Sequence, residues 1–217
     1  MRPSKSDLKQ IKVVAFDCDG VMFDTRKANR AYYNRLLSRF ELPPMTDDQF
    51  AYVQQHTVHR SIAHLFQDES MRAQALEERE LLSYASFIKE MEIEPDLVFL
   101  LEKLRSGFHT AVATNRSNTM NAVLTEHGLA PLFDLVVTAL DVMHPKPAPD
   151  PLIKVSTHFS VTPGEVFYIG DSKLDEEASL GAGVVFAAYR NPALKADFHI
   201  RHLKEVEEIL FPSFTIS

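Results

Sequence analysis

The sequence lacks the features that mark exported, membrane-spanning or nucleic-acid-binding proteins. It contains a single cysteine, which excludes an internal disulfide and favours a reducing cytoplasm. The polar stretch from Met1 to Gln10 has no apolar core like that of a signal peptide, and no apolar run approaches the ~20 residues that span a bilayer. Basic residues are also scarce, because 23 lysines and arginines face 30 acidic residues and leave a net charge of −7. We therefore expect a cytoplasmic protein without a membrane or nucleic-acid partner.

The composition that remains is that of an ordinary globular protein. Apolar residues make up 45% and charged residues 24% of the 217 residues, with no internal repeat or low-complexity tract. This length suffices for one hydrophobic core and a smaller subdomain. The negative net charge still permits a small anionic substrate, because a metal ion and a few local cations can reverse the potential inside a cleft.

Five short apolar runs alternate with segments of helical periodicity. The segment from Asp96 to Ser106, for example, has leucines at helical spacing and is followed by Gly107, a typical helix terminator. Strands separated by helices are typical of βαβ units, so the sequence predicts an α/β fold with a parallel sheet. The predicted strands are Ile11–Phe16, His109–Ala113, Leu135–Thr138, Val166–Ile169 and Val184–Ala187, and the predicted helices between the later strands are Asp96–Ser106, Asn118–His127, Pro151–Phe159 and Asp175–Leu180.

Residues 25–93 break this alternation. The region contains no strand-like run, and its apolar residues recur at helical spacing. Because it is inserted after the first predicted strand, we interpret it as a helical subdomain, with residues 1–24 and 94–217 forming the core. Its predicted helices are Arg26–Phe40, Asp47–His56, Val58–Gln67 and Met71–Met91, with Pro43-Pro44 between the first two.

Two carboxylates, Asp17 and Asp19, stand where the first predicted strand ends. In an open parallel sheet, ligands bind at the carboxyl ends of the strands. Two acids placed so closely in a buried position repel each other and lose hydration. The pair is therefore best explained by a bound cation or proton that relieves the repulsion.

Three further polar clusters follow other predicted strands. Thr114-Asn115 comes directly after the second strand, Lys146 lies among three prolines beyond the third, and Asp171 and Asp175 follow the fourth. Because the carboxyl ends of parallel strands share one edge of the sheet, we expect the four clusters to converge in space. This convergence is a stronger indication of function than any single motif.

The converging residue types suit phosphoryl chemistry. Asp17, Asp19 and Asp171 supply hard oxygen ligands of the kind that Mg²⁺ prefers. The Thr114 hydroxyl, the Lys146 ammonium group and Mg²⁺ together form a receptor for a phosphoryl group. One carboxylate can attack phosphorus to form an aspartyl-phosphate. A second can protonate the departing alkoxide and later take a proton from water, which completes the set of groups needed to hydrolyse a phosphate monoester.

Each cluster also has an ordinary structural interpretation. Asp17 and Asp19 are common turn residues, Thr114-Asn115 can cap a helix, and Lys146 can be a loop lysine. Asp171 and Asp175 are favourable at the start of a helix, and direct metal ligation by Asp175 is left open. Other candidate substrate contacts are Tyr52, His56, His59, Arg60 and Arg116. The histidines also raise the question of a zinc site, which the absence of cysteine partners disfavours.

The four clusters resemble the ordered motifs of the haloacid dehalogenase superfamily, in its phosphoglycolate phosphatase and β-phosphoglucomutase branch. The resemblance extends from Lys12 to about Asn191 and includes the helical insert. It implies a Rossmann-like core of residues 1–24 and 94–217 with residues 25–93 as a helical cap over the active edge. The motifs are Asp17-Cys18-Asp19-Gly20-Val21, Thr114-Asn115, Lys146-Pro147 and Gly170-Asp171-Ser172-Lys173-Leu174-Asp175.

The resemblance also implies a role for each motif residue. Asp17 is expected to be the nucleophile and a Mg²⁺ ligand, and Asp19 the general acid and base, with its backbone carbonyl on the metal. Dehalogenating members lack an acid at the Asp19 position, so its presence favours phosphate chemistry. Side-chain ligation of Mg²⁺ is expected from Asp171, and Asp175 is expected to support the site from behind. The transferring phosphoryl group is expected to be held by Thr114, Asn115 and Lys146.

We therefore expect a Mg²⁺-dependent, phosphoglycolate phosphatase-like enzyme that hydrolyses a small phosphorylated metabolite through an aspartyl-phosphate. Two alternatives are a sugar phosphomutase of the β-phosphoglucomutase type and a phosphoacceptor signalling module that does not turn over. The helical insert and the proton donor at Asp19 disfavour the signalling module, which needs neither a lid nor an acid. For assembly, we expect a monomer or a weak homodimer.

Overall fold

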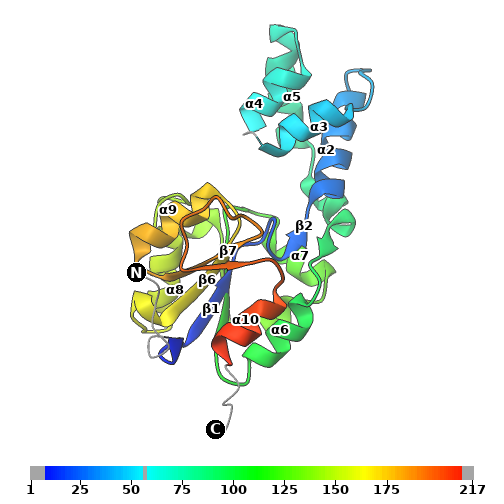
Figure 1. The fold of residues 1–217 in the computed structure, drawn as a ribbon. Coiled ribbons are helices and arrows are strands. Elements are labelled where there is room, and N and C mark those ends of the chain that lie inside the picture. The colour runs from blue at the N-terminus through cyan, green and yellow to red at the C-terminus, as the bar shows by residue number, and fades with distance from the viewer. Residues whose placement is uncertain (1–7, 56–57, 212–217) are drawn as a thin grey trace. The chain divides into compact units, whose positions relative to one another are not determined.

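A computed structural model describes residues 8–55 and 58–211, and the chain divides into two compact units (Figure 1). The core unit comprises Met1–Asp24 and Ile93–Ser217, and the helical unit comprises Thr25–Glu92. Short strands at the two connections, β2 (Phe23–Asp24) and β3 (Glu92–Ile93), form a two-stranded sheet.

The core unit is built on a six-stranded sheet with the strand order β5-β4-β1-β6-β7-β8. All five strand pairings in this sheet are parallel. Because β1 lies between β4 and β6, the residues that follow these three strands emerge side by side at one edge. The strands are β1 (Val13–Phe16), β4 (His109–Ala113), β5 (Leu135–Val137), β6 (Val166–Gly170), β7 (Val185–Tyr189) and β8 (Phe198–Ile200).

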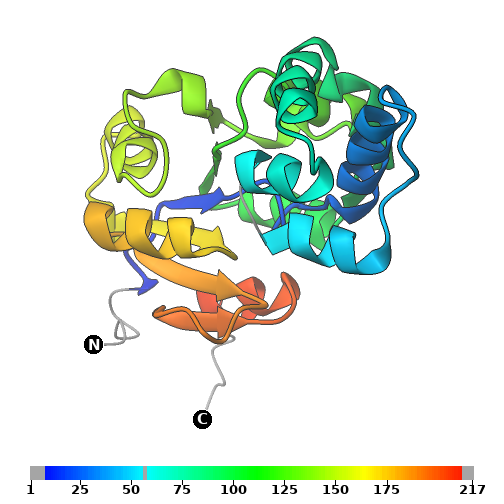
Figure 2. The same ribbon diagram turned by 90° about the horizontal axis from the view of Figure 1, so that it is seen from above.

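Helices cover both faces of the sheet. Figure 1 shows α8 and α9 on one side and α6, α7 and α10 on the other, and Figure 2 shows α8 and α9 from above. Alternate strand residues, such as Val13 and Ala15 of β1, pack with Leu152 and Ala178 in the buried layer beneath α8 and α9. The helices are α6 (Leu97–Leu104), α7 (Met120–Glu126), α8 (Asp150–His158), α9 (Lys173–Ala182) and α10 (Lys204–Leu210), with the 3-10 turns η2 (Ala130–Leu132), η3 (Ala139–Asp141) and η4 (Pro163–Glu165).

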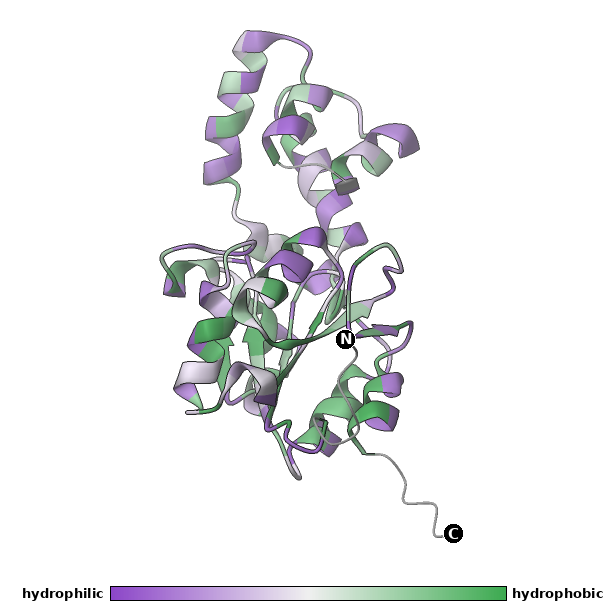
Figure 3. Ribbon diagram, turned by 60° about the vertical axis from the view of Figure 1, so that its left-hand side comes forward, coloured by the Kyte–Doolittle hydropathy of each residue, from purple (hydrophilic) through white to green (hydrophobic). Residues whose placement is uncertain are grey.

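This arrangement confirms the predicted α/β, Rossmann-like class. In Figure 3 apolar residues are concentrated in the strands of the core unit, as expected for a sheet that is buried on both faces. Among the described residues, no helix combines the length and apolar character that crossing a bilayer requires.

The helical unit contains four α-helices and a 3-10 helix in its described residues. Its core is formed by apolar and aromatic side chains, among them Tyr32, Leu36, Ile62 and Phe66. Tyr32 packs edge-on against Phe87, with ring centroids 5.6 Å apart. The helices are α2 (Arg26–Ser38), α3 (Asp47–Gln55), α4 (Val58–Leu65), α5 (Glu69–Leu81) and η1 (Tyr84–Glu90).

The structure differs from the predicted secondary structure in two places. The predicted helix Met71–Met91 is divided into α5 and η1, because Ser83 has an extended backbone and its hydroxyl accepts from the Ala85 N–H. The strand β8 was not predicted, because a three-residue strand with the polar His199 at its centre forms no apolar run. It pairs with β7 through Ala187 and Phe198.

Candidate active site

Asp17 and Asp171 lie side by side because their strands are neighbours. Asp17 follows β1 directly, and its N–H donates to the carbonyl of Ile169 in β6 at 2.9 Å. Asp171 is the first residue after β6. The parallel register, in which Phe16 is opposite Ile169, therefore brings the two acids to the same point on the sheet edge.

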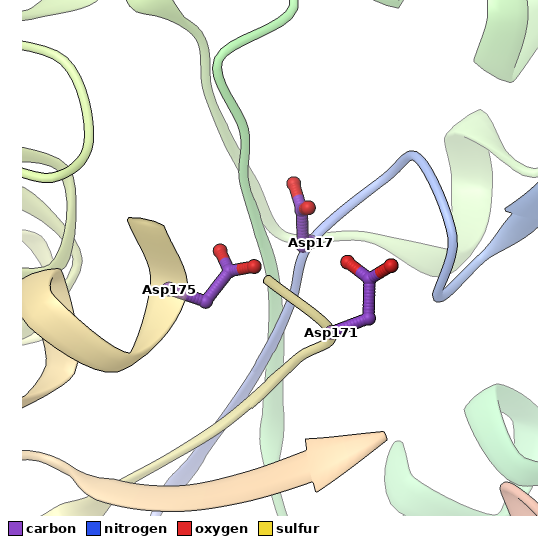
Figure 4. A group of neighbouring side chains, drawn as sticks. All are labelled: Asp17, Asp171 and Asp175. Carbon is purple, nitrogen blue, oxygen red and sulfur yellow. The ribbon is translucent and has the colours of Figure 1, made fainter. Parts of the chain in front are cut away.

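A third acid, Asp175, completes a buried group of carboxylates. It lies in the first turn of α9, and carboxylate oxygens of Asp17, Asp171 and Asp175 lie within 4.8 Å of one another (Figure 4). Two glycines make this approach possible. A Cβ on Gly20, which has φ +83, would lie 2.2 Å from Asp171 Oδ2, and a Cβ on Gly170 would lie 2.4 Å from the Asp175 Cβ.

Lys146 forms ion pairs with two of these acids. Its side chain is 2% exposed, and Nζ donates to Asp17 Oδ1 at 2.8 Å and to Asp175 Oδ1 at 2.6 Å. The third N–H donates to the Tyr168 hydroxyl at 2.9 Å. Tyr168 is fully buried, and its single hydroxyl proton has two acceptors within reach, Asp175 Oδ1 at 2.7 Å and the Ala113 carbonyl at 3.0 Å. All three ammonium protons of Lys146 are thus used, so its direction is fixed.

Both carboxylate oxygens of Asp175 accept hydrogen bonds from neighbouring protein groups. Oδ1 accepts from Lys146 and Tyr168, whereas Oδ2 accepts from the N–H and hydroxyl of Ser172 in the capping box of α9. The geometry therefore assigns Asp175 to holding Lys146 and the start of α9. We refer to Asp17, Lys146, Asp171 and Asp175 together as the inner cluster.

Burial and mutual repulsion shift the ionisation of the inner cluster. Burial raises the pKa of Asp17 to about 7, against the attraction of Lys146. Burial and the charges of Asp17 and Asp175 also raise the pKa of Asp171 to about 7. For Asp175 burial acts in the same direction, but Lys146 and the hydrogen bonds outweigh it and lower its pKa. Burial acts to lower the pKa of Lys146, but the two carboxylates outweigh it and raise that pKa.

The inner cluster fits a divalent cation. Three carboxylates face one ammonium group, which leaves two negative charges without compensation when all the acids are ionised. The donors are carboxylate oxygens, the ligand type of hard cations. Because Asp175 already accepts four hydrogen bonds, Asp17 and Asp171 are the side chains best placed to hold an ion.

Asp19 is paired with Arg116. Arg116 Nε donates to Asp19 Oδ2 at 3.2 Å, and Nη2 donates to Oδ1 at 2.5 Å. This is a bidentate, charge-assisted contact. The Asp19 side chain is 42% exposed and the Arg116 side chain 9%. We refer to these two residues as the outer pair.

Thr114 and Asn115 contact members of these two groups, and the other predicted residues belong to the helical unit. Thr114 is buried directly after β4, and its hydroxyl accepts from the Arg116 N–H at 3.1 Å. Asn115 donates from its amide to the Lys146 carbonyl at 2.7 Å, so it fixes the Lys146 loop. In the helical unit, Tyr52 stacks on His64 with ring centroids 3.9 Å apart. The candidate His56 lies outside the described residues.

Sequence reasoning missed Tyr168 and underestimated Arg116. Tyr168 had a usable signal, because a phenol in a buried strand directly before Gly170-Asp171 requires a polar partner. Arg116 was considered only as a candidate substrate contact. Its pairing with Asp19 joins residues 97 positions apart and depends on side-chain direction, which no local pattern indicates.

Comparison with known proteins identifies the family. A sequence model of haloacid dehalogenase-like hydrolases matches residues 14–189. Because this match covers most of the 217 residues, the chain belongs to the haloacid dehalogenase-like hydrolase family. The predicted superfamily and hydrolase class are thereby confirmed.

Three similar proteins illustrate the relationship. The phosphoglycolate phosphatase of Salmonella typhi is 26% identical over 204 residues, which cover 81% of this chain and 80% of the relative. The N-acetylmuramic acid 6-phosphate phosphatase of Pseudomonas aeruginosa is 26% identical over 217 residues, with 93% and 95% covered. The crystal structure of a HAD-superfamily hydrolase of subfamily IA from Geobacter sulfurreducens is 34% identical, with a TM-score of 0.87 and 93% and 97% covered.

Proposed function

We propose that this hydrolase is a Mg²⁺-dependent phosphatase that acts on a small phosphorylated metabolite through an aspartyl-phosphate on Asp17. The observation that carries the proposal is the inner cluster, in which a buried aspartate is held by Lys146 at 2.8 Å beside two further acids. The two relatives with phosphatase names support the same chemistry. A phosphorylated hydroxy acid such as phosphoglycolate is therefore the first substrate class to test.

In the first half-reaction, an oxygen of Asp17 attacks phosphorus and the bond from phosphorus to the leaving-group oxygen breaks. Asp19, which takes up a proton on the oxygen that turns away from Arg116, gives this proton to the departing alkoxide, which leaves as an alcohol. In the second half-reaction, water attacks the phosphorus of the aspartyl-phosphate and gives a proton to Asp19. The bond to Asp17 breaks, inorganic phosphate is released and both acids return to their starting state.

Fixed cationic and hydroxyl groups hold the transferring phosphoryl group. Lys146 already faces Asp17, so its charge lies beside the atom that is phosphorylated. The Thr114 hydroxyl follows the adjacent strand β4, and Asn115 keeps the Lys146 loop in place. Rigid placement of these groups lowers the barrier because little reorganisation is needed as charge develops.

Mg²⁺ would be held by the side chains of Asp17 and Asp171 and by the backbone carbonyl of Asp19. When bound, it supplies positive charge that neutralises the crowded acids and the phosphoryl oxygens. We further propose that the helical unit, residues 25–93, acts as a cap that excludes bulk water and sets substrate choice.

The test is a screen of phosphorylated metabolites with Mg²⁺, read out as inorganic phosphate release by the wild type and by Asp17→Asn. We expect turnover of at least one monoester by the wild type and none by the variant. If β-glucose 1-phosphate yields glucose 6-phosphate instead of free phosphate, the enzyme is a phosphomutase. Stable labelling by acetyl phosphate without turnover of any monoester would favour the signalling module.

A further inference from the structure

The outer pair combines one fixed side chain with one partly free side chain. Arg116 is held on several sides: its N–H donates to Thr114 Oγ1, its carbonyl accepts from Ala139, and Nη1 donates to Thr119 Oγ1, each at 3.1 Å. Its side chain is 9% exposed, whereas that of Asp19 is 42% exposed. The exposed acid is therefore paired with a buried, preorganised cation.

The proposed proton transfer requires such a tie. Asp19 must bring one carboxyl oxygen to the leaving group and later to the attacking water, and a half-exposed side chain has many rotamers that reach neither. A guanidinium group offers several N–H donors in a planar fork. One oxygen of Asp19 can stay on Arg116 while the other turns to carry the proton.

We propose that Arg116 is the positioning residue of the acid and base Asp19. Arg116 holds the Asp19 carboxyl group through two hydrogen bonds, so its removal should affect catalysis through proton transfer. The proton given to the alkoxide is the one that water returns, so no further reactant is needed. This inference rests on the proposed phosphatase function.

The dependence on the leaving group tests the role directly. p-Nitrophenolate departs without a proton, whereas the alkoxide of glycerol 2-phosphate needs one. The parameter kcat/KM includes the steps up to formation of the aspartyl-phosphate, so it reports this donation. We expect Arg116→Ala to lower kcat/KM about 30- to 100-fold for glycerol 2-phosphate and less than about threefold for p-nitrophenyl phosphate.

Three comparisons make the result specific. Asp19→Asn should show the same selectivity with a larger loss, and the double variant Asp19→Asn, Arg116→Ala should be no worse than Asp19→Asn alone. Arg116→Lys retains a donor and should recover part of the loss, which a misfolded protein would not do. Arg105→Ala, an exposed arginine in the same unit, should change neither substrate.

Equal losses on both esters, or losses that add to those of Asp19→Asn, would overturn the inference and make Arg116 a phosphate ligand. An unchanged kcat/KM for glycerol 2-phosphate in Arg116→Ala would overturn it as well. If the wild type releases phosphate from neither ester and from no monoester of the metabolite screen with Mg²⁺, the proposed function itself fails. The two failures are thus distinguishable.

Discussion

In the inner cluster, the Lys146 and Asp175 side chains are 2% and 0% exposed, and every ammonium proton of Lys146 has an acceptor. In the outer pair, the Asp19 side chain is 42% exposed and has one cationic partner. When all the acids are ionised, the inner cluster carries an excess of negative charge, whereas the outer pair is balanced. In the proposed mechanism this difference corresponds to two tasks: the buried groups hold charge, and the exposed, paired Asp19 transfers a proton.

The largest predicted effect is at the centre of the inner cluster. Asp17→Asn should reduce turnover of any monoester about 10⁴-fold or more, because the variant removes the proposed nucleophile. Glu102→Gln, which neutralises an exposed acid of the same unit, is the matched control and should be unaffected. Steady-state phosphate release measures both, and appreciable turnover by Asp17→Asn would remove the basis for the comparison.

A change in the outer pair should affect catalysis without affecting the metal. Asp19→Asn should lose about 10²- to 10⁴-fold in turnover of alkyl phosphates, which is the usual contribution of general acid and base catalysis. Its Mg²⁺ midpoint should stay the same, because the proposed contact there is the backbone carbonyl. A titration of activity with Mg²⁺ measures both quantities, and a shifted midpoint would contradict the separation of tasks.

Loss of the Lys146 ammonium group from the inner cluster should lower the stability of the protein. Lys146→Met leaves Asp17 and Asp175 buried without their partner, so we expect the free energy of unfolding to fall by about 3–5 kcal/mol. Lys154→Met removes a half-exposed lysine near Asp141 and should cost about 0–1 kcal/mol. Urea unfolding of both variants in the absence of metal measures the contrast, which similar losses would refute.

The smallest predicted effect concerns Tyr168, whose hydroxyl accepts a hydrogen bond from Lys146. Tyr168→Phe removes one hydroxyl, which leaves one buried N–H of Lys146 without its acceptor. We expect the free energy of unfolding to fall by about 1–3 kcal/mol, with a reduced kcat, because Lys146 loses one of its three fixed contacts. Urea unfolding and steady-state kinetics give the two values, and no change in either would show that the hydroxyl has no supporting role.

The sheet and the meeting of the acids were predictable for a physical reason. Parallel strands place their carboxyl ends at one edge, so Asp17, Lys146 and Asp171 could be expected together from their positions after strands. The directions in which the side chains point at that edge were not predictable. The turn of Asp19 toward Arg116 and the three contacts of Lys146 depend on rotamers and on packing between distant segments.

The break in a predicted helix and the short strand β8 could not be predicted from the spacing of apolar residues. Ser83 interrupts a helical pattern with one side-chain hydrogen bond, and β8 contributes to the sheet through three residues that include His199. In both cases tertiary context and capping outweigh the pattern of apolar residues. The helical unit has apolar spacing that predicts helices but no motif that indicates a ligand, so its substrate preference could not be inferred.

The central claim is that a bound divalent cation compensates the excess negative charge of the inner cluster. In the unfolded chain, Asp17 and Asp171 ionise near their ordinary pKa of 3.8, whereas in the folded protein without metal both have a pKa of about 7. Between about pH 4 and pH 7 the folded protein therefore binds more protons than the unfolded chain. In this window the contribution of these acids to stability falls as the pH rises.

The most direct measurement is thermal unfolding of wild type and Asp171→Asn at pH 5.5 and pH 8, with and without Mg²⁺. We predict that Mg²⁺ raises the Tm of the wild type much more at pH 8, where the acids are ionised, than at pH 5.5, where protons compete. The increase should be largely lost in Asp171→Asn. An increase of the same size at both pH values, or one that persists in Asp171→Asn, would contradict the account.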